Sequence, residues 1–480
     1  MNIRIIAYVV GMALNIEAVL FALPLVTAVI YGDSLIPFII PAVICLAIGI
    51  PFTRKKPKIG SLYSKEGFVS TGITWIAMSL TGMLPFMIDG AIPSAFDAFF
   101  ETVSGFTTTG ASILTDVEAL SHSLLMWRSQ MHWIGGMGIL VFMLAMVPLS
   151  GGTQMNLMKA ESPGPSISKL VPKAQDTARI LYSIYAFLTL LTGIVLVLLK
   201  MPLFDAICIS FGAAGTGGFS VLNSGCASYT MAQQAVITIA MIAFGVNFQF
   251  YYLLILKRFS IAFSMEEVKT YFMIIVGSIA LITINLVCHN VYDSVGRAVH
   301  DASFHVGSII TTTGFATTDV NLWPNLSQGI LVLLMFCGAC AGSTGGGLKV
   351  SRAILLFKSY VREARAILHP GIIKKVHMDG KAVDEGVIRA TGAYFFIYMV
   401  ITAAAILLVS LDHLDWPTTF TAVIATFNNI GPGLGEVGTV GNYSGFSDFS
   451  KLILSGCMLI GRLEIFPIML LFMKKTWTKF

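Results

Sequence analysis

Four short apolar segments of the chain end in a turn-prone tetrapeptide with glycine in its third position. The tetrapeptides are Thr108-Thr109-Gly110-Ala111, Thr216-Gly217-Gly218-Phe219, Thr312-Thr313-Gly314-Phe315 and Asn429-Ile430-Gly431-Pro432. The glycines are 108, 96 and 117 residues apart, and the residues thirteen positions before them are Asp97, Asp205, Asp301 and Thr418. Four copies in one register predict a single pore assembled from one polypeptide.

Each segment is too short to cross a membrane. A thirteen-residue helix rises about 20 Å, whereas the hydrocarbon core is about 30 Å thick. We therefore expect four re-entrant half-helices, each N-capped by the Asp or Thr at its start. The irregular backbone that follows is tolerated at that depth only where it is buried in protein or lines a water-filled cavity.

Glycine suits a site for a desolvated cation because it adopts positive φ and lets carbonyl oxygens crowd round an axis. Rings of carbonyls replace the hydration shell of alkali cations, and the C-terminus of a half-helix adds partial negative charge. The first three residues of each tetrapeptide are the predicted filter. For any one copy alone, close helix packing by a small residue is the alternative.

The composition is that of a membrane protein, with 56% apolar and 11% charged residues, against about 25% charged in soluble domains. Ten stretches could cross, at 4–30, 36–53, 68–88, 123–148, 180–199, 231–256, 270–288, 328–348, 389–411 and 450–473. The expected fold is an all-α polytopic membrane protein: two additional N-terminal transmembrane helices, then a fourfold pseudo-symmetric pore of four span, half-helix and span repeats. The corresponding parts are residues 1–60 and pore repeats one to four at 61–155, 156–262, 263–368 and 369–480.

Lysine and arginine gather on one side of this ten-span arrangement, in residues 54–65, 159–179, 257–269, 349–389 and 474–479. The positive-inside rule makes that side cytoplasmic, and both termini are expected there. The loops on the opposite side are acidic. Acidic outer loops would raise the local concentration of cations. The alternative is that the positive-inside rule places the basic residues in the cytoplasm and leaves the acidic residues outside, with no further role. The net charge of +5 reflects topology and does not point to nucleic acid.

The filter motifs, the loop Ala160-Glu161-Ser162-Pro163-Gly164-Pro165 and the Asn429-Ile430-Gly431-Pro432-Gly433 signature resemble the Trk/Ktr/HKT superfamily of potassium transporters. The two extra N-terminal helices resemble the bacterial Trk-type membrane subunit. The resemblance implies a homodimer in the bacterial cytoplasmic (inner) membrane, one potassium pathway per subunit, and a cytoplasmic RCK-type nucleotide-binding regulatory subunit. Potassium is then the transported ion, nucleotide is expected only on the partner, and neither a cofactor nor a structural metal is expected. Glycine in third place of all four segments implies a preference for potassium, and Gly217 departs from the threonine of segments one and three.

A glycine-rich run interrupts the second span of repeat three. Each glycine in a helix costs about 1 kcal/mol relative to alanine, so we expect the span to break there. Such a break would leave a polar loop beneath the third filter segment, where the superfamily has an intramembrane gate. Its predicted residues are Gly342, Ser343, Thr344, Gly345, Gly346 and Gly347. The alternative is a loop at the cytoplasmic surface, because Lys349 and Arg352 follow closely.

Arg462 lies midway along the last span. A charge at that depth costs at least about 2.5 kcal/mol, so such residues usually face an interior cavity. If it faces the pore, its positive charge below the filter limits cation flux, and the superfamily carries an arginine here. The alternative is a salt bridge to another span. Weaker candidates, which more often join helices by hydrogen bonds, are Arg128, Gln130, His132, Asn247 and Gln249.

The basic stretch from about 350 to 390 is expected to dock a regulatory subunit or to lie against anionic lipid. No Walker-type loop or Cys/His metal spacing indicates an enzyme. The predicted function is potassium uptake through a pore with a four-part carbonyl filter, gated by the intramembrane loop and a cytoplasmic subunit. The alternative is a proton- or sodium-coupled symporter with broken helices at the midplane.

Overall fold

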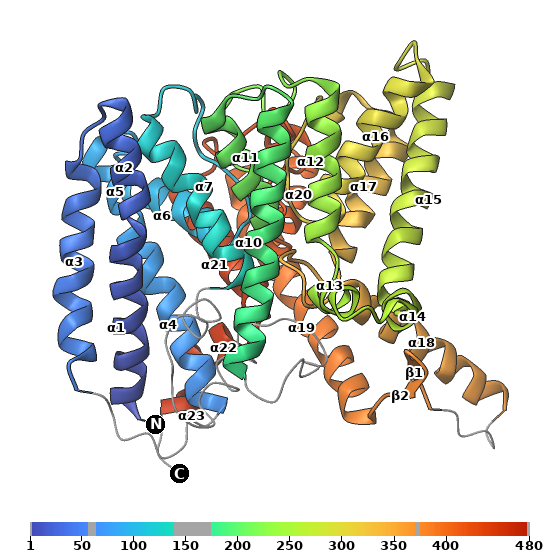
Figure 1. Cartoon of the computed structure of the whole chain (residues 1–480). Helices are drawn as coiled ribbons and strands as arrows, with labels where there is room; N and C mark the ends of the chain where they lie inside the picture. Colours follow the sequence, from blue (N-terminus) through green and yellow to red (C-terminus); the bar gives the residue numbers. More distant parts are fainter. Residues whose placement is uncertain (1, 56–63, 139–173, 370–374, 478–480) are drawn as a thin grey trace.

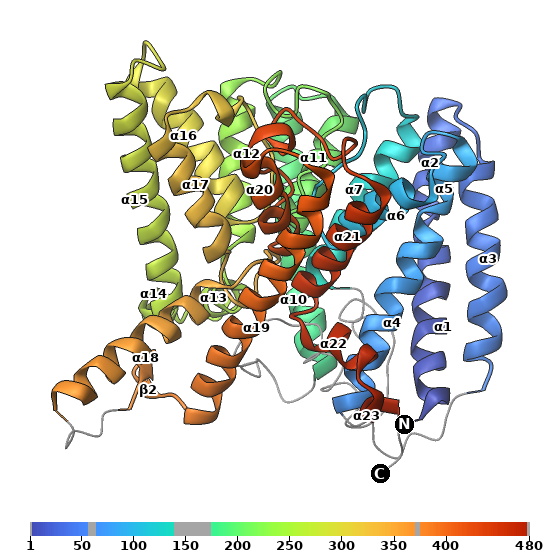
Figure 2. The same ribbon diagram turned by 180° about the vertical axis from the view of Figure 1, so that it is seen from behind.

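The computed structural model describes residues 2–55, 64–138, 174–369 and 375–477. The Ala160–Pro165 loop named above lies outside these residues. Apart from one short hairpin, the regular structure in the described residues is all helical, and most helices stand side by side in one bundle (Figures 1 and 2). The bundle begins at one edge with α1 (Ile3–Leu20), α2 (Ala22–Tyr31) and α3 (Ile36–Thr53).

The remaining helices follow the predicted order of span, short helix and span four times. Repeat one contains α4 (Ser64–Gly82), α5 (Leu84–Asp89), α6 (Ala95–Phe106) and α7 (His122–Met137). Repeat two contains α10 (Ala174–Leu198), α11 (Leu203–Gly215), α12 (Met231–Phe244), α13 (Phe248–Ile255) and α14 (Phe259–Ser264). Repeat three contains α15 (Glu266–Cys288), α16 (Val295–Ile310), α17 (Asn325–Cys337) and α18 (Val350–Leu368). Repeat four contains α19 (Glu385–Val409), α20 (Trp416–Phe427), α21 (Asp448–Arg462), α22 (Phe466–Phe472) and α23 (Lys474–Trp477).

Short elements complete the connections. Three 3-10 turns are η1 (Val320–Leu322), η2 (Ser410–Asp412) and η3 (Gly435–Val437). Between α18 and α19, β1 (His377–Met378) pairs antiparallel with β2 (Lys381–Ala382) to form a small hairpin.

The second spans of repeats two, three and four are where the structure departs from ten uninterrupted crossings, and the end of the second span of repeat one lies outside the described residues. Within the described residues six helices are long and apolar enough to span, and they include the first span of every repeat. In repeat two α12 and α13 meet at 91°. In repeat three α17 ends at Cys337, and in repeat four α21 ends at Arg462 before α22 begins. In these three repeats a long first span is therefore followed by a broken second span.

The four short helices α6, α11, α16 and α20 have 12, 13, 16 and 12 residues, and all lie in the upper half of Figure 1. The prediction of their N-caps was wrong. The capping residues are Ser94, Pro202, Ser294 and Asp415. Asp97, Asp205 and Thr418 occupy the third helical position instead, and Asp301 lies further inside α16 because that helix is longer. In α6 and α20 the true cap accepts a hydrogen bond from the backbone N–H of Asp97 or Thr418, both at 3.3 Å.

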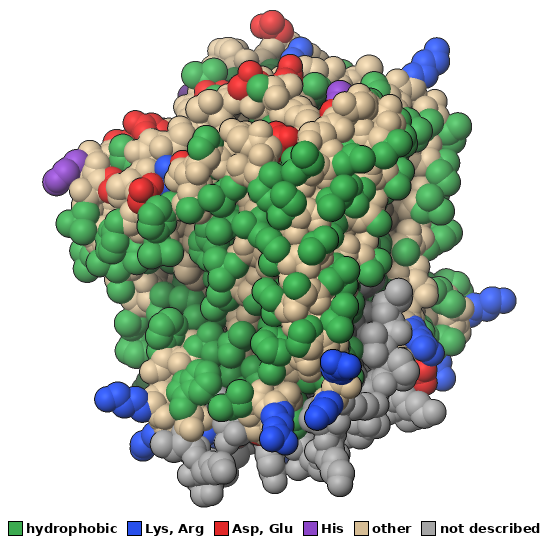
Figure 3. Space-filling model, turned by 90° about the vertical axis from the view of Figure 1, so that its left-hand side faces the viewer, with side chains coloured by type: hydrophobic (Ala, Val, Ile, Leu, Met, Phe, Trp, Pro, Cys, Tyr) green, Lys and Arg blue, Asp and Glu red, His purple; other side chains and the backbone are tan. Residues whose placement is uncertain are grey.

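The surface divides into three zones from top to bottom. On the face drawn in Figure 3 a broad apolar band crosses the middle, with most Asp and Glu above it and most Lys and Arg below it. The first residues of α1 and the last helix, α23, both lie at the basic end (Figure 1). This distribution is what a bilayer-spanning protein needs, because the apolar band faces hydrocarbon.

Candidate ion-conducting site

The four tetrapeptides follow the C-termini of the four short helices and meet in a closed ring. A Cβ atom at Gly110 would come within 3.0 Å of the carbonyl oxygen of Gly217 in the next segment. Round the ring, a Cβ atom at each of the other three glycines would likewise come within 3.0 Å of a carbonyl oxygen of the next segment. The pairs are Gly218 with Thr313 O, Gly314 with Ile430 O and Gly431 with Thr109 O. Each third-place glycine thus leaves the space that the next segment's middle carbonyl fills, so a side chain there has no room.

The backbone of each tetrapeptide has positive φ at its first and third residues. The first residues have φ between 55° and 59°, and they are Thr108, Thr216, Thr312 and Asn429. The third-place glycines have φ between 77° and 90°. Left-handed backbone at a residue other than glycine costs about 1–3 kcal/mol. Four such residues at equivalent positions therefore require firm support from their surroundings.

Threonine and asparagine side chains supply part of that support. The hydroxyls of Thr107 and Thr109 lie 2.8 Å apart, and those of Thr311 and Thr313 lie 2.7 Å apart. The side-chain amide of Asn429 donates to the Thr109 hydroxyl at 2.9 Å. This last bond joins segment four to segment one, which are 320 residues apart in the chain.

The loops that follow the filter segments form a second ring of contacts on the acidic side. Backbone N–H groups bridge neighbouring repeats at 2.7 to 2.9 Å, from Val117 to the Asn223 side chain, from Cys226 to Ala316 O, from Gly435 to the Asn321 side chain and from Tyr443 to Ser112 O. The Asn223 amide also donates to Asp116 at 2.8 Å. That hydrogen bond lowers the pKa of the Asp116 carboxyl.

A buried ion pair supports the first two filter segments from behind. Arg128 on α7 contacts Glu101 on α6 at 2.9 Å, with 2% and 0% of their side chains exposed. Glu101 also accepts from the Ser112 hydroxyl, and Arg128 donates to Ser220 O and lies 4.0 Å from the centre of the Phe219 ring. Arg128 was a weaker candidate for a functional charge, with a helix-joining role as the alternative, and here it joins α7 to α6. Glu101 was overlooked, although it is an acid within an apolar half-helix.

His132 explains why segment two has glycine where two other segments have threonine. Its Nε2 accepts from the Phe219 N–H at 3.2 Å, so the proton is on Nδ1, which donates to Gly105 O at 2.8 Å. A Cβ atom at Gly217 would collide with the His132 ring. Gln130, another of the weaker candidates named from the sequence, donates to Leu20 O at 2.9 Å and so connects α7 to α1.

The glycine-rich run forms the irregular loop expected from its sequence, between the end of α17 and the start of α18. The N–H of Gly346 donates to the Thr312 hydroxyl at 2.6 Å. A Cβ atom at Gly346 would meet Asn428 O at 2.5 Å. The loop is therefore packed against the inner ends of segments three and four. Lys349 and Arg352 are 1% and 6% exposed, in contrast to the surface loop considered as an alternative.

Arg462 lies at the end of α21, between the first filter segment and the loop. Its guanidinium donates to the Thr108 hydroxyl at 3.2 Å and to Thr344 O at 2.9 Å. It also donates to Gly136 O at 2.6 Å and to Gly135 O. One cation thus binds filter, loop and α7 together. A second cation, Lys349, donates to Gly345 O within the loop itself.

Two carboxylates hold the loop at its ends, and neither was singled out from the sequence. Glu267 at the start of α15 is 4% exposed, and its Oε1 accepts from the backbone N–H groups of Ala341 (2.7 Å) and Ser351 (3.1 Å). Glu464 receives two hydrogen bonds from Arg352, at 3.0 and 2.6 Å. Glu464 has φ 55°, which is a strained backbone conformation, and it lies at the break between α21 and α22. Its bonds to Arg352 therefore connect this break to α18, the helix that follows the loop.

Asn247 and Gln249 lie at the break of the second span in repeat two. The Asn247 side chain caps α13 by accepting from the Gln249 N–H at 2.9 Å. The backbone N–H of Phe248 donates to Gly342 O at 3.0 Å. This break therefore contacts the loop of repeat three, and the Asn247 side chain lies next to Gly342 of that loop.

The chemistry available in the ring is that of backbone carbonyls and hydroxyls. Within the described residues no group of three or more His, Cys, Asp or Glu side chains could hold a metal ion. Carbonyl oxygens coordinate hard cations without forming covalent bonds. The arrangement is thus suited to binding and passing a cation.

Comparison with known proteins places these features in a family. The family model of the TrkH cation transport proteins matches residues 38–479. The Trk system potassium uptake protein TrkH of Salmonella typhimurium is 34% identical, covering 99% of this chain and 100% of the relative. The TrkH protein of Halomonas elongata is 32% identical, with 100% of both chains covered.

A solved structure agrees with this match across the whole fold. The crystal structure of the potassium transporter TrkH from Vibrio parahaemolyticus has a TM-score of 0.89 and 31% identity, with 100% of both chains covered. With its apolar spans, the chain is a multi-pass inner-membrane protein and not an enzyme. It belongs to the TrkH family of cation transport proteins.

Proposed function

We propose that this chain is the membrane subunit of a potassium uptake system and that potassium passes through the ring of four filter segments. The observation that carries the proposal is the closure of the ring, in which each third-place glycine abuts a carbonyl of the next segment. Carbonyls held at fixed spacing substitute for the water shell of a potassium ion. The names of the relatives, which are potassium uptake proteins, support the choice of ion.

The loop from Gly338 to Lys349 is the proposed gate. It lies beneath the filter, with Gly346 bonded to segment three and Arg462 bonded to both Thr344 and Thr108. In this position it obstructs the path of an ion that leaves the ring. The hydrogen bonds to Glu267 favour the closed state, because that carboxylate accepts from the backbone N–H groups of Ala341 and Ser351 only while the loop is in place.

The basic end of the molecule is the proposed cytoplasmic side, with both termini there. A cytoplasmic RCK-type nucleotide-binding subunit would control the gate, and two copies of the chain would form a homodimer. The word "system" in the names of the relatives fits a protein with several components. The helix α18 leads from the loop to this side, so a partner that displaced α18 would pull on the gate.

A proton- or sodium-coupled potassium symporter is the second candidate. The observation in its favour is the broken second span of several repeats, since discontinuous helices form the binding sites of many carriers. The four half-helices lie in the same half of the molecule, however, whereas those carriers have inverted repeats. A continuous conduction path with a gate is therefore the better description.

The test is ion flux through the purified chain in liposomes. Potassium and rubidium should enter well ahead of sodium, driven by membrane potential alone. Equal passage of sodium would refute the filter. A potassium flux that disappears when the proton and sodium gradients are removed would establish the symporter instead.

The gate has a separate test that leaves the filter untouched. Replacing Glu267 with alanine should raise basal rubidium flux without changing selectivity, since Ala341 and Ser351 lose their acceptor. Glu363→Ala, at a carboxylate with 61% of its side chain exposed, is the matched control. Unchanged flux in a folded Glu267→Ala protein would argue against a role of Glu267 in holding the loop closed.

A further inference from the structure

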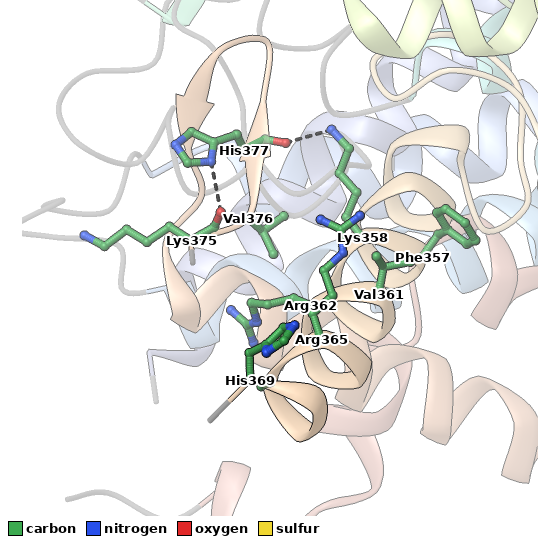
Figure 4. Close-up of a pocket in the computed structure, with 10 residues that line it drawn as sticks. Phe357, Lys358, Val361, Arg362, Arg365, His369, Lys375, Val376 and His377 are labelled. Carbon is green, nitrogen blue, oxygen red and sulfur yellow. Dashed lines mark hydrogen bonds between the residues drawn. The ribbon is translucent and has the colours of Figure 1, made fainter. Parts of the chain in front are cut away.

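A basic groove lies on α18, at the end of the molecule where most Lys and Arg gather. The groove has a volume of about 350 Å³ and runs between α18 and the strand β1. In Figure 4 the basic side chains of α18 line it together with His369, while Val361 and Val376 form its apolar floor. In Figures 1 and 2 α18 extends outward past the foot of α15, beyond the rest of the bundle.

The cations in the groove differ in how far they are already neutralised. Lys358 pairs with Glu266 and donates to His377 O, and Arg362 pairs with Glu363 and Glu385. No side-chain ion pair or hydrogen bond of Arg365 occurs within the part of the chain that the structure describes. Arg365 is exposed and lies one helical turn before His369. On α18 the groove thus presents one cation without a carboxylate, the guanidinium of Arg365, beside two cations that are paired with carboxylates.

A second face of α18 is apolar and uncovered. Phe357, Tyr360, Ala364 and Ile367 are spaced three, four and three residues apart, so they form one stripe on the helix. The side chains of Phe357, Tyr360 and Ile367 are between 61% and 81% exposed. A stripe of this size on a helix that leaves the bundle is unusual in water. Phe357 lies at the border of the basic groove, whereas Tyr360, Ala364 and Ile367 do not line it.

We propose that α18 is an interfacial helix whose groove binds the phosphate of an anionic membrane lipid of the inner leaflet. The apolar stripe would lie among acyl chains, and Arg365 would bind the headgroup. Helices with an apolar face and a basic face lie in the membrane interface, and basic pockets at the inner side of membrane proteins bind anionic headgroups. The position of α18 beside the foot of the spans meets the same requirement. The inference concerns lipid binding and does not depend on the proposed path of potassium.

Lipid fits these observations better than an acidic protein partner or a second copy of the chain. A partner surface made only of acidic side chains would use the charge but would leave the apolar stripe in water. A second copy could cover the stripe but, with the same basic groove, would not neutralise Arg365. An anionic lipid supplies an apolar chain and a negative headgroup in one molecule, and α18 lies beside the foot of the spans, where such lipids are found.

The experiment is native mass spectrometry of the full chain in detergent, titrated with phosphatidylglycerol, phosphatidylcholine or inorganic phosphate. Phosphatidylglycerol should bind more tightly than phosphatidylcholine, and inorganic phosphate should not bind. Each basic residue near an anionic surface contributes about 1 kcal/mol, so Arg365→Gln should weaken phosphatidylglycerol binding about fivefold. Arg365→Lys should restore it, and Arg258→Gln, at an exposed arginine next to α14, should have no effect.

Three results would overturn the proposal. One is equal loss of lipid in Arg365→Gln and in the Arg258→Gln control. Another is equal binding of phosphatidylglycerol and phosphatidylcholine, which would leave no role for the phosphate charge. The third is a combination of two observations: Phe357→Cys forms a disulfide between two copies in a lipid membrane, and Arg365→Gln leaves lipid binding unaffected. That result would make α18 a contact between chains.

Discussion

Replacing Gly110 with serine should widen the ring at one point and reduce its preference for potassium over sodium. Gly110 has φ 79°, and a Cβ atom there would lie within 3.0 Å of Gly217 O. Ordinary contact begins at 3.4 Å, so the carbonyl has to retreat by at least 0.4 Å. A ring that selects by cavity size and carbonyl number is sensitive to such a shift.

Gly90 supplies a control that separates crowding from backbone strain. It has nearly the same φ, 84°, but no atom lies within 4 Å of the position that its Cβ would take. Serine at either position incurs about 1–2 kcal/mol of left-handed strain. Only serine at Gly110 adds overpacking of about 1–3 kcal/mol. If that energy falls on the potassium-occupied filter, the preference drops about 5- to 150-fold.

The assay is rubidium and sodium uptake into liposomes, with Gly90→Ser and wild-type protein in parallel. Gly90→Ser should keep the wild-type ratio, while Gly110→Ser should bring the two rates closer together. The reasoning fails if Gly110→Ser retains the wild-type ratio. It fails also if Gly90→Ser loses the preference to the same extent, because strain and not the ring would then be responsible.

Three further perturbations test the surroundings of the filter. Arg462→Gln should raise potassium flux in the same liposome assay, because it removes a positive charge below the filter, and Arg462→Lys should keep the flux low. Equally raised flux in both variants would mean that the hydrogen bonds of Arg462 matter and its charge does not. Glu101→Ala should destabilise the protein by about 3–5 kcal/mol, because it leaves Arg128 buried without a partner; an unchanged denaturation midpoint would refute this. Asn223→Ala should lower the melting temperature at pH 7. Since the pKa of Asp116 is lowered in the folded protein, that stabilisation exists above its unfolded pKa, and the gap should narrow as the pH falls below about 4; a gap that widened in acid would contradict it.

The short helices and their glycine turns could be predicted because identical offsets recur four times in the sequence. The same offsets misled the choice of N-caps. An acid is favoured at the third helical position by the helix dipole as well as at the cap, so Asp97 and Asp205 look like caps from sequence alone. In α6 the cap is Ser94, three residues earlier. The pattern locates the helix but does not separate these two positions.

The broken second spans could be predicted only where glycine marks the break. The Gly342–Gly347 run predicted that the second span of repeat three would break, and α17 ends at Cys337 just before it. The break after α21 contains Glu464 and Ile465, with φ 55° and 68°. A β-branched residue in that region is an outlier, and no local preference predicts it. Tertiary contacts such as the Arg352–Glu464 pair hold this backbone, and hydropathy does not reveal them.

The closure of the ring within one polypeptide changes what a mutation can do. In a pore built from four identical subunits, a single codon change alters every quarter of the filter together. Here Gly110, Gly218, Gly314 and Gly431 are separate positions, and each abuts a different neighbour. Selection can therefore adjust one quarter at a time, and His132 beside Gly217 is an example of a local adjustment that the other three quarters do not share. Ion preference in such a pore can change in small steps.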